Sequence, residues 1–332
     1  MKRIRLSLAS ILLLAAFQSG NGYHLLKTIP LGAAEGGGEY FDYIHFDPAA
    51  RRVYVSHGTE FKILDAGTST VLGTVSGLKR DHGVALVPAL HRGFISDGSA
   101  AEIVMFDLTT FKVLSRIKGE NDADSILYDP ASRHVFAFNG DSMSATVIDP
   151  EKGTVLSSIQ LGGKPEQAVA DGNGMIYDNL EDKNEVIAID SRRLEIKSRW
   201  PVAPAGQPVS IALDSGHRRL FIAGRNPQSL IVMDTATGKI VAGPYPIGQR
   251  VDTTVFDPAL ALVAASTGDG AISIFHEDSP DKLTPVETVK TEYGAKTMAL
   301  DPKTHNLYVS TSDFNDQRRP IPGTFRLLIY GH

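Results

Sequence analysis

Residues 44–75 read IHFDPAARRVYVSHGTEFKILDAGTSTVLGTV, and this stretch holds one complete copy of the unit that builds the chain. A first apolar run ends in the turn Asp47-Pro48, where the carboxylate caps the backbone and proline fixes φ. Further runs follow at 53–56, before Asp65 and at 70–75. Short apolar runs separated by turn residues predict four strands of antiparallel sheet in about 42 residues.

The same unit recurs along the chain at steps of 40 to 44 residues. The turn that ends the first strand is marked by Asp47-Pro48, Val87-Pro88, Asp129-Pro130, Asp171-Gly172, Asp214-Ser215, Asp257-Pro258 and Asp301-Pro302. The third strand ends at Asp65, Asp107, Asp149, Asp190 and Asp234, with His276 and Gly331 in the degenerate copies. Four short strands at this period are typical of a β-propeller, in which stacked sheets bury both faces. We therefore predict an all-β, seven-bladed β-propeller with four antiparallel strands per blade.

The ends of the repeat region predict how the ring of blades closes. The last blade ends in its third strand, at 327–330, whereas 24–29 reads like a fourth strand without a blade of its own. We expect this N-terminal strand to complete the last blade, because unpaired strand edges invite aggregation. An insertion at 313–325 separates the second and third strands of that blade, and it is either a disordered surface loop or a lid or partner contact.

The first 22 residues have the pattern of an export signal. Lys2, Arg3 and Arg5 precede an uncharged stretch at 6–17, which is too short to span a bilayer, and small residues lead to Gly22. We predict a signal peptide at 1–22, with a buried N-terminal helix as the alternative, and a propeller domain at 23–332. The mature protein is then expected to be periplasmic or secreted. No second long apolar stretch exists, so no membrane span is expected after cleavage.

Composition excludes several classes of function. The chain has no cysteine, which excludes disulfides, thiolate zinc sites, iron–sulfur clusters and covalent haem. Its net charge of −5 argues against a nucleic-acid partner. The sequence lacks the familiar serine-hydrolase, zinc-protease and phosphate-loop motifs. We expect a monomer whose partner is an unknown small molecule or protein, and a divalent cation is the one cofactor left open.

Propeller geometry places the candidate site where the first strands enter the central channel, because loops of every blade converge there. The residue five places before each turn marker should lie near this entrance: Asp42, His82, Asp124, Glu166, Val209, Asp252 and Lys296. A second series directly follows the second strands of the first four blades and consists of His57, Asp97, Asn139 and Asn179. Two positions further out than the first series stand Tyr40, Arg80, Asp122, Lys164, Gln207 and Arg250, of which three are basic.

These side chains suit two kinds of ligand. Carboxylates, amide oxygens and imidazoles are ligands for a divalent cation. The basic residues Arg80, Lys164, Arg250 and Lys296 suit the anionic groups of a polar organic molecule. The alternative to both is a wet channel whose polar lining needs no ligand, with Lys296 as the internal partner of the acids.

Several motifs resemble the YVTN-repeat family of seven-bladed propellers, whose members are often exported bacterial proteins. The resemblance is carried by the strands Tyr54-Val55-Ser56 and Tyr308-Val309-Ser310, by Asp-x-x-Thr turns and by Val-Leu-Gly-Thr-Val at 71–75. It covers roughly 23–332 and implies a fold rather than a reaction.

The sequence leaves hypotheses from different classes. The first is an exported binding or scaffold protein that presents a polar channel mouth to a small ligand or protein partner. The second is a metal-dependent hydrolase of the lactonase type, because the oxygen-rich mouth is similar in layout to that of gluconolactonase-type propellers, which have six blades. A quinoprotein-like redox subunit is disfavoured, since no cofactor motif is visible.

Overall fold

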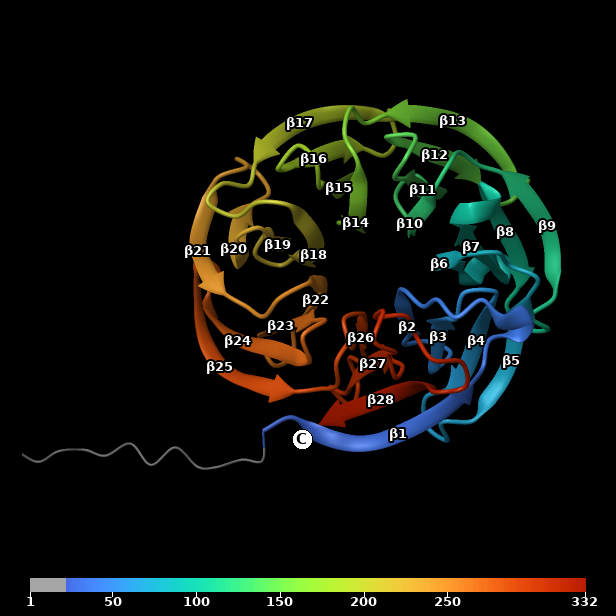
Figure 1. Cartoon of the computed structure of the whole chain (residues 1–332). Coiled ribbons are helices and arrows are strands. Elements are labelled where there is room, and N and C mark those ends of the chain that lie inside the picture. The colour runs from blue at the N-terminus through green and yellow to red at the C-terminus, as the bar shows by residue number, and fades with distance from the viewer. Residues whose placement is uncertain (1–21) are drawn as a thin grey trace, which may run out of the picture.

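Seven antiparallel sheets of four strands each surround a central channel in the computed structural model, which describes residues 22–332 (Figure 1). Each sheet is one blade, and in the first six blades the strands run outward from the channel in sequence order. This arrangement confirms the predicted all-β, seven-bladed propeller. The predicted signal peptide at 1–22 lies outside the described residues except for Gly22.

The strand bounds follow the repeat. Blade 1 consists of β2 (Ile44–Asp47), β3 (Arg52–Ser56), β4 (Glu60–Asp65) and β5 (Val71–Ser76). Blade 2 consists of β6 (Asp81–Val87), β7 (Arg92–Asp97), β8 (Glu102–Asp107) and β9 (Val113–Lys118). Blade 3 consists of β10 (Ala123–Asp129), β11 (His134–Asn139), β12 (Ser144–Asp149) and β13 (Thr154–Gln160). Blade 4 consists of β14 (Pro165–Ala170), β15 (Met175–Leu180), β16 (Glu185–Asp190) and β17 (Glu195–Pro201). Blade 5 consists of β18 (Pro208–Asp214), β19 (Arg219–Arg225), β20 (Gln228–Asp234) and β21 (Ile240–Pro246). Blade 6 consists of β22 (Val251–Asp257), β23 (Leu262–Thr267), β24 (Ala271–Ser279) and β25 (Lys282–Lys290). Short 3₁₀ turns are η1 (Glu35–Gly37), η2 (Pro88–Leu90) and η3 (Gly98–Ala100).

Blade 7 is built from both ends of the described chain. Its strands are β26 (Met298–Leu300), β27 (Leu307–Thr311), β28 (Phe325–Gly331) and, outermost, β1 (His24–Gly32). Strand β1 pairs antiparallel with β28 from His24 opposite Gly331 to Gly32 opposite Phe325 (Figure 1). The N-terminal strand therefore completes the last blade, as predicted.

The core lies between the blades. In the described part of the chain, seven apolar clusters each join one pair of neighbouring blades. Between blades 3 and 4, for example, Phe136 and Phe138 pack against Ile176 and Ile187. The second and third strands are thus buried on both faces, which explains their continuous apolar runs. Outer strands such as β17 alternate between exposed and partly buried residues, because only their inner face is covered.

The repeated aspartates act as turn residues. The Oδ1 atom of Asp65 accepts hydrogen bonds from the amides of Gly67 and Thr68, at 2.9 and 2.7 Å, and from the Thr68 hydroxyl at 3.0 Å. Asp107 and Asp234 make the same contacts in their own Asp-x-x-Thr turns. These motifs therefore fix the turns between third and fourth strands.

The predicted insertion is a loop at 312–324 between β27 and β28. The Thr324 hydroxyl accepts a hydrogen bond from the amide of Asp313 at 2.9 Å, and it lies 2.7 Å from the Ser312 hydroxyl. Phe314 packs edge-on against Tyr293, with ring centroids 5.2 Å apart. These contacts hold the loop against the rest of blade 7 and its neighbour.

The two ends of the channel open on different faces. We call the face with the connections between second and third strands the upper face, since the first strands also begin there. The opposite, lower face carries the turns between first and second strands. Among the helices of residues 22–332, none combines the length and the apolar character needed to cross a membrane.

Candidate functional site

Irregular pairing at the upper ends of the inner strands places the predicted first series at the channel. The register between first and second strands shifts between Asp81 and Val84, and the same happens in four later blades. The first residue inside each bulge is His82, Asp124, Glu166, Val209 or Asp252. A bulge releases a residue from the ladder and redirects its side chain. We call Asp42, His82, Asp124, Glu166, Asp252 and Lys296 the charged ring.

On one side of the charged ring, His82 bridges two carboxylates. Its Nδ1 atom lies 2.7 Å from Asp42 Oδ2 and 3.1 Å from Asp124 Oδ1. The Tyr40 hydroxyl donates to Asp42 Oδ2 at 2.7 Å. His82 is 2% exposed, so these contacts form almost without solvent. Contacts of this kind favour a charged imidazole between two acids.

The pKa shifts agree with that geometry. Burial opposes a charge on His82, but hydrogen bonds to Asp124 and Asp42 outweigh it and raise the pKa to about 10. Burial also acts to raise the pKa of Asp42, yet Lys296 and His82 hold it at about 2. The pKa of Asp124 is raised, because burial outweighs its hydrogen bond with His82. Asp42 is therefore the stronger partner of the imidazolium, and Asp124 is the weaker acid.

On the other side of the charged ring, cations and acids alternate. Lys296 Nζ donates to Asp252 Oδ2 at 2.6 Å, and the Arg225 guanidinium donates to Asp252 Oδ1. Arg225 also lies 3.6 Å from Glu181 Oε1, which accepts a hydrogen bond from the Gln207 amide at 2.7 Å. Lys296 attracts Asp42 as well, so the chain of charges continues to the His82 side.

The alternation breaks between Asp124 and Glu166. Burial and the Asp124 carboxylate raise the pKa of Glu166 well above its ordinary range, and a hydrogen bond with Glu181 adds to the shift. Within residues 22–332, the ion pairs give Asp124 only His82 as a cationic partner and give Glu166 none. The nearby Asp178 is fully buried, and both its carboxylate oxygens lack a hydrogen-bond partner in that range. Burial raises the pKa of Asp178 well above its usual value. Arg225 attracts the Glu166 carboxyl group electrostatically but forms no ion pair with it. We call the stretch between Asp124 and Glu166 the acidic break, because its carboxyl groups have the least cationic compensation in the ring.

The predicted second series does not join the charged ring. Fully buried His57 stacks on Phe325, with centroids 4.1 Å apart, and its Nε2 atom lies 3.1 Å from Glu39. The Asp97 carboxylate accepts hydrogen bonds from the backbone amides of Lys79 and Arg80. The remaining members lie inside their blades: Asn139 donates to Ser144 and Thr146, and the buried amide of Asn179 has no partner among the described residues. These residues support loops and blade contacts at the upper face.

The predicted basic residues divide into two groups. Lys296 belongs to the charged ring, whereas Arg80 and Arg250 stack on rim aromatics. The Arg80 guanidinium lies 4.5 Å from the centre of the Tyr40 ring, and Arg250 lies 4.5 Å from that of Tyr293. Lys164 Nζ lies 3.8 Å from Glu181 Oε2, and Glu181 is not a residue of the first series. Only part of the basic set therefore faces the channel acids directly.

Within the described part of the chain, two groups of side chains have the composition of cation sites. Asp42, His82 and Asp124 each offer a ligand atom within 4.8 Å of the others. The second group lies between blades 5 and 6, where Asp214 and Glu277 are buried and His217 is exposed. In the first group, His82 already lies between the two carboxylates, so a metal ion there would compete with the imidazolium.

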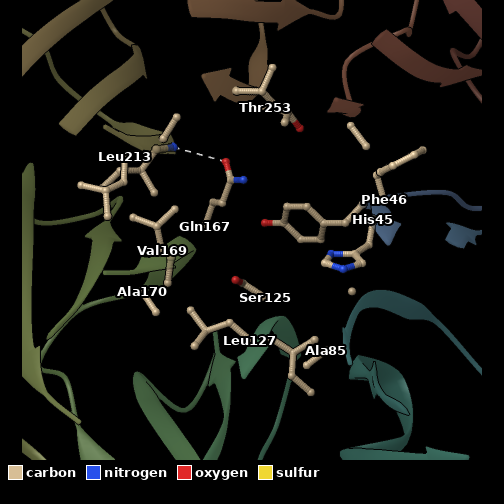
Figure 2. Close-up of a pocket in the computed structure, with 18 of the residues that line it drawn as sticks. His45, Phe46, Ala85, Ser125, Leu127, Gln167, Val169, Ala170, Leu213 and Thr253 are labelled. Carbon is tan, nitrogen blue, oxygen red and sulfur yellow. Dashed lines mark hydrogen bonds between the residues drawn. The ribbon is translucent and has the colours of Figure 1, made fainter. Parts of the chain in front are cut away.

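Beneath the charged ring the channel holds a cavity of about 740 Å³, which we call the chamber (Figure 2). All the innermost strands of the described chain contribute to its wall, yet no residue of the charged ring lines it. Turn residues of the lower face, including Pro130, Gly172 and Ser215, line its other end. The hollow part of the channel therefore extends to the face opposite to the predicted mouth.

Comparisons with known proteins show the fold alone. No protein-family model matches the chain, and no curated protein matches it. A chain of hydrazine synthase from Kuenenia stuttgartiensis is similar over 82% of this chain and 92% of its own length, at 15% identity and a TM-score of 0.72. A chain in the crystal structure of the mitotic checkpoint complex is similar over 100% of this chain and 99% of its own, at 13% identity and a TM-score of 0.77. Both support the propeller architecture, and the resemblance to the YVTN-repeat family stays a prediction.

Proposed function

We propose that the protein is an exported binding protein whose channel receives the positively charged group of a small ligand or of a protein partner. The β-propeller fold supports a binding or scaffold role in general. The acidic break between Asp124 and Glu166 is the observation that carries the more specific proposal. Two neighbouring carboxyl groups with raised pKa gain most from an added cation, because the cation offsets both burial and mutual repulsion.

The lactonase-type alternative gains no support from this geometry. Its cation would have to displace His82 from two short contacts, at 2.7 and 3.1 Å, before it could bind Asp42 and Asp124 together. The acidic break instead leaves the existing ion pairs intact. A cation or ammonium group at the break adds to the ring rather than replacing part of it.

Isothermal titration calorimetry tests the binding proposal. The purified protein is titrated with Ca²⁺, Mg²⁺, Mn²⁺, Zn²⁺ and ethylammonium chloride, the last as a minimal organic cation. We expect at least one of these probes to bind. The double variant Asp124→Asn, Glu166→Gln should lower its affinity at least tenfold, since it removes the two carboxyl groups that can be negative beside a bound cation.

A matched control separates the ring from general electrostatics. Asp141→Asn with Glu151→Gln makes the same chemical change at two exposed positions of blade 3 and should leave the affinity unchanged. A melting curve of each variant confirms that the fold is retained. If none of the probes binds to the unmutated protein, or if the ring variant binds as tightly as the control, the proposal is wrong.

The contacts of Tyr23 support export with cleavage after Gly22. Tyr23 is 7% exposed, and its hydroxyl donates to the carbonyl of His305 at 2.8 Å. Its backbone nitrogen donates to Glu287 Oε1 at 3.0 Å. Cleavage before Tyr23 would turn this nitrogen into a charged amine beside a carboxylate, which strengthens the contact. Intact-mass measurement of the extracytoplasmic protein should give a chain that begins at Tyr23, and a retained Met1 there would contradict the prediction.

A further inference from the structure

We propose that the chamber holds the partly apolar body of an organic amine, whose ammonium group lies at the acidic break and which enters from the lower face. The inference rests on the proposed function, because the charged ring supplies the partner of the ammonium group. It adds the class of ligand and the direction of entry. The entry face is the opposite of the one that the sequence predicts.

The chamber begins directly below the charged ring. Ser125 and Gln167 line its upper part, and each follows a residue of the acidic break in sequence, Asp124 and Glu166 respectively. Thr253 follows Asp252 in the same way. A ligand that fills the chamber can therefore reach the break without leaving the channel.

Uncharged polar side chains line the upper end of the chamber. Gln167 Oε1 accepts the backbone amide of Ile211 at 3.2 Å, which fixes the side-chain amide and leaves its NH₂ group free of protein partners in the described chain (Figure 2). The Thr253 hydroxyl is buried and also lacks a partner there. Burial and the acids of the ring raise the pKa of Tyr43 well above its usual value, so its phenol stays protonated. Burial lowers the pKa of His45, which keeps that imidazole neutral.

Further down, the wall is apolar apart from His45, which stands at the same position of the repeat as Ala85, Leu127 and Val169. Ala85, Leu127, Val169 and Leu213 face the chamber from four different blades, as Figure 2 shows. Asp171 is the acidic residue of the lining and lies at the lower rim, where it accepts backbone amides of its own turn. An apolar wall with a few uncharged hydrogen-bonding groups suits a neutral ring system, and about 740 Å³ is the size of a small-molecule site.

Charge decides which end of the ligand points upward. The acids of the ring outnumber its basic residues on the side of blades 3 and 4, and the chamber itself carries charge only at its rim. An amine with an aromatic body satisfies both regions at once. A neutral molecule of the same shape would fill the chamber but leave the break without a cation.

The experiment compares tryptamine, ethylammonium and tryptophol by isothermal titration calorimetry. Tryptophol has the indole body of tryptamine but a hydroxyl in place of the amine. We expect tryptamine to bind at least tenfold more tightly than either of the other two. Val169→Phe, which narrows the chamber at a half-buried position, should remove this advantage while ethylammonium binds as before.

Each other outcome contradicts a defined part of the account. Equal affinities of tryptamine and ethylammonium would overturn the chamber and leave the ring proposal standing, as would an unchanged advantage in a folded Val169→Phe variant. Equal affinities of tryptamine and tryptophol would overturn the assignment to an amine. If neither amine binds, the chamber proposal is wrong, and the ring proposal is wrong as well only if none of the four metal ions binds either.

Discussion

His82 offers the most direct test of the electrostatics of the charged ring. In the folded protein its pKa is raised to about 10 from an ordinary value of 6.5. A raised pKa in the folded state means that the stabilisation is fully present below pH 6.5 and is lost as the pH rises through about 10. At 1.36 kcal/mol for each pKa unit, the shift corresponds to about 5 kcal/mol of unfolding free energy. Such a loss is large beside a typical total stability of about 5–15 kcal/mol.

The perturbation is His82→Gln, which keeps a hydrogen-bond donor near Asp42 but removes the charge. Denaturant unfolding of the variant and the unmutated protein at pH 6, 8 and 10 should give a difference that is largest at pH 6 and falls by several kcal/mol toward pH 10. His91→Gln, at an exposed turn of blade 2, is the control and should show no such trend.

A difference that stays the same at every pH would refute the assignment of a charged imidazole. If the variant does not fold, the unmutated protein still provides a test. The NMR signals of the His82 ring should then titrate near pH 10, and a midpoint near 6.5 would contradict the account.

Two further predictions concern blade closure and a buried acid. Leu31→Ala, in β1 at 8% exposure, should lower the unfolding free energy by about 2–5 kcal/mol, whereas Leu26→Ala, at 46% exposure in the same strand, should change it little. Equal melting temperatures for both variants would mean that β1 is only loosely attached. Asp178→Asn should stabilise the protein at pH 8 by about 1–3 kcal/mol. The pKa of Asp178 is raised in the folded state, so this carboxyl group makes the protein less stable as the pH rises above about 4. The gain from the substitution should therefore shrink toward pH 4. Denaturant midpoints at the two pH values measure this difference, and a loss of stability at pH 8 would contradict it.

The sequence predicts the blades and the depth of the charged ring because both follow from the repeat. The turn that ends each first strand fixes the end of that strand, so a residue five places earlier lies near its other end. Asp42 and Lys296, from blades far apart in sequence, are brought close enough for their charges to interact. The same reasoning predicts that β1 closes blade 7, since a strand pattern without a blade matches a blade without a strand.

Other features of the site depend on information that the repeat does not carry. The position of a residue along a strand predicts its depth in the channel but not the direction of its side chain. His57 and Asp97 have the expected depth, yet His57 stacks on Phe325 of blade 7 and Asp97 accepts a hydrogen bond from the backbone amide of Lys79. The predicted site omits Arg225 and Glu181, because neither belongs to an inner strand. Arg225 ends β19 and pairs with Asp252 of the charged ring, and Glu181 lies in a loop of blade 4 and contacts Arg225. An unusual Arg at the end of a second strand is the one signal that could have indicated the former. The size and shape of the chamber depend on how the side chains of seven inner strands fill the channel. A pattern within one stretch of sequence cannot predict them.

The central claim is that a ligand supplies the cation missing between Asp124 and Glu166. Burial and the Asp124 carboxylate raise the pKa of Glu166 well above its ordinary range, so a cation bound beside it should lower that pKa and favour release of a proton. Titration of the protein with tryptamine in phosphate and in Tris, two buffers of different ionisation enthalpy, measures this release. The account predicts different apparent enthalpies in the two buffers and equal ones in Glu166→Gln. Tight binding with the same enthalpy in both buffers, retained in Glu166→Gln, would contradict it.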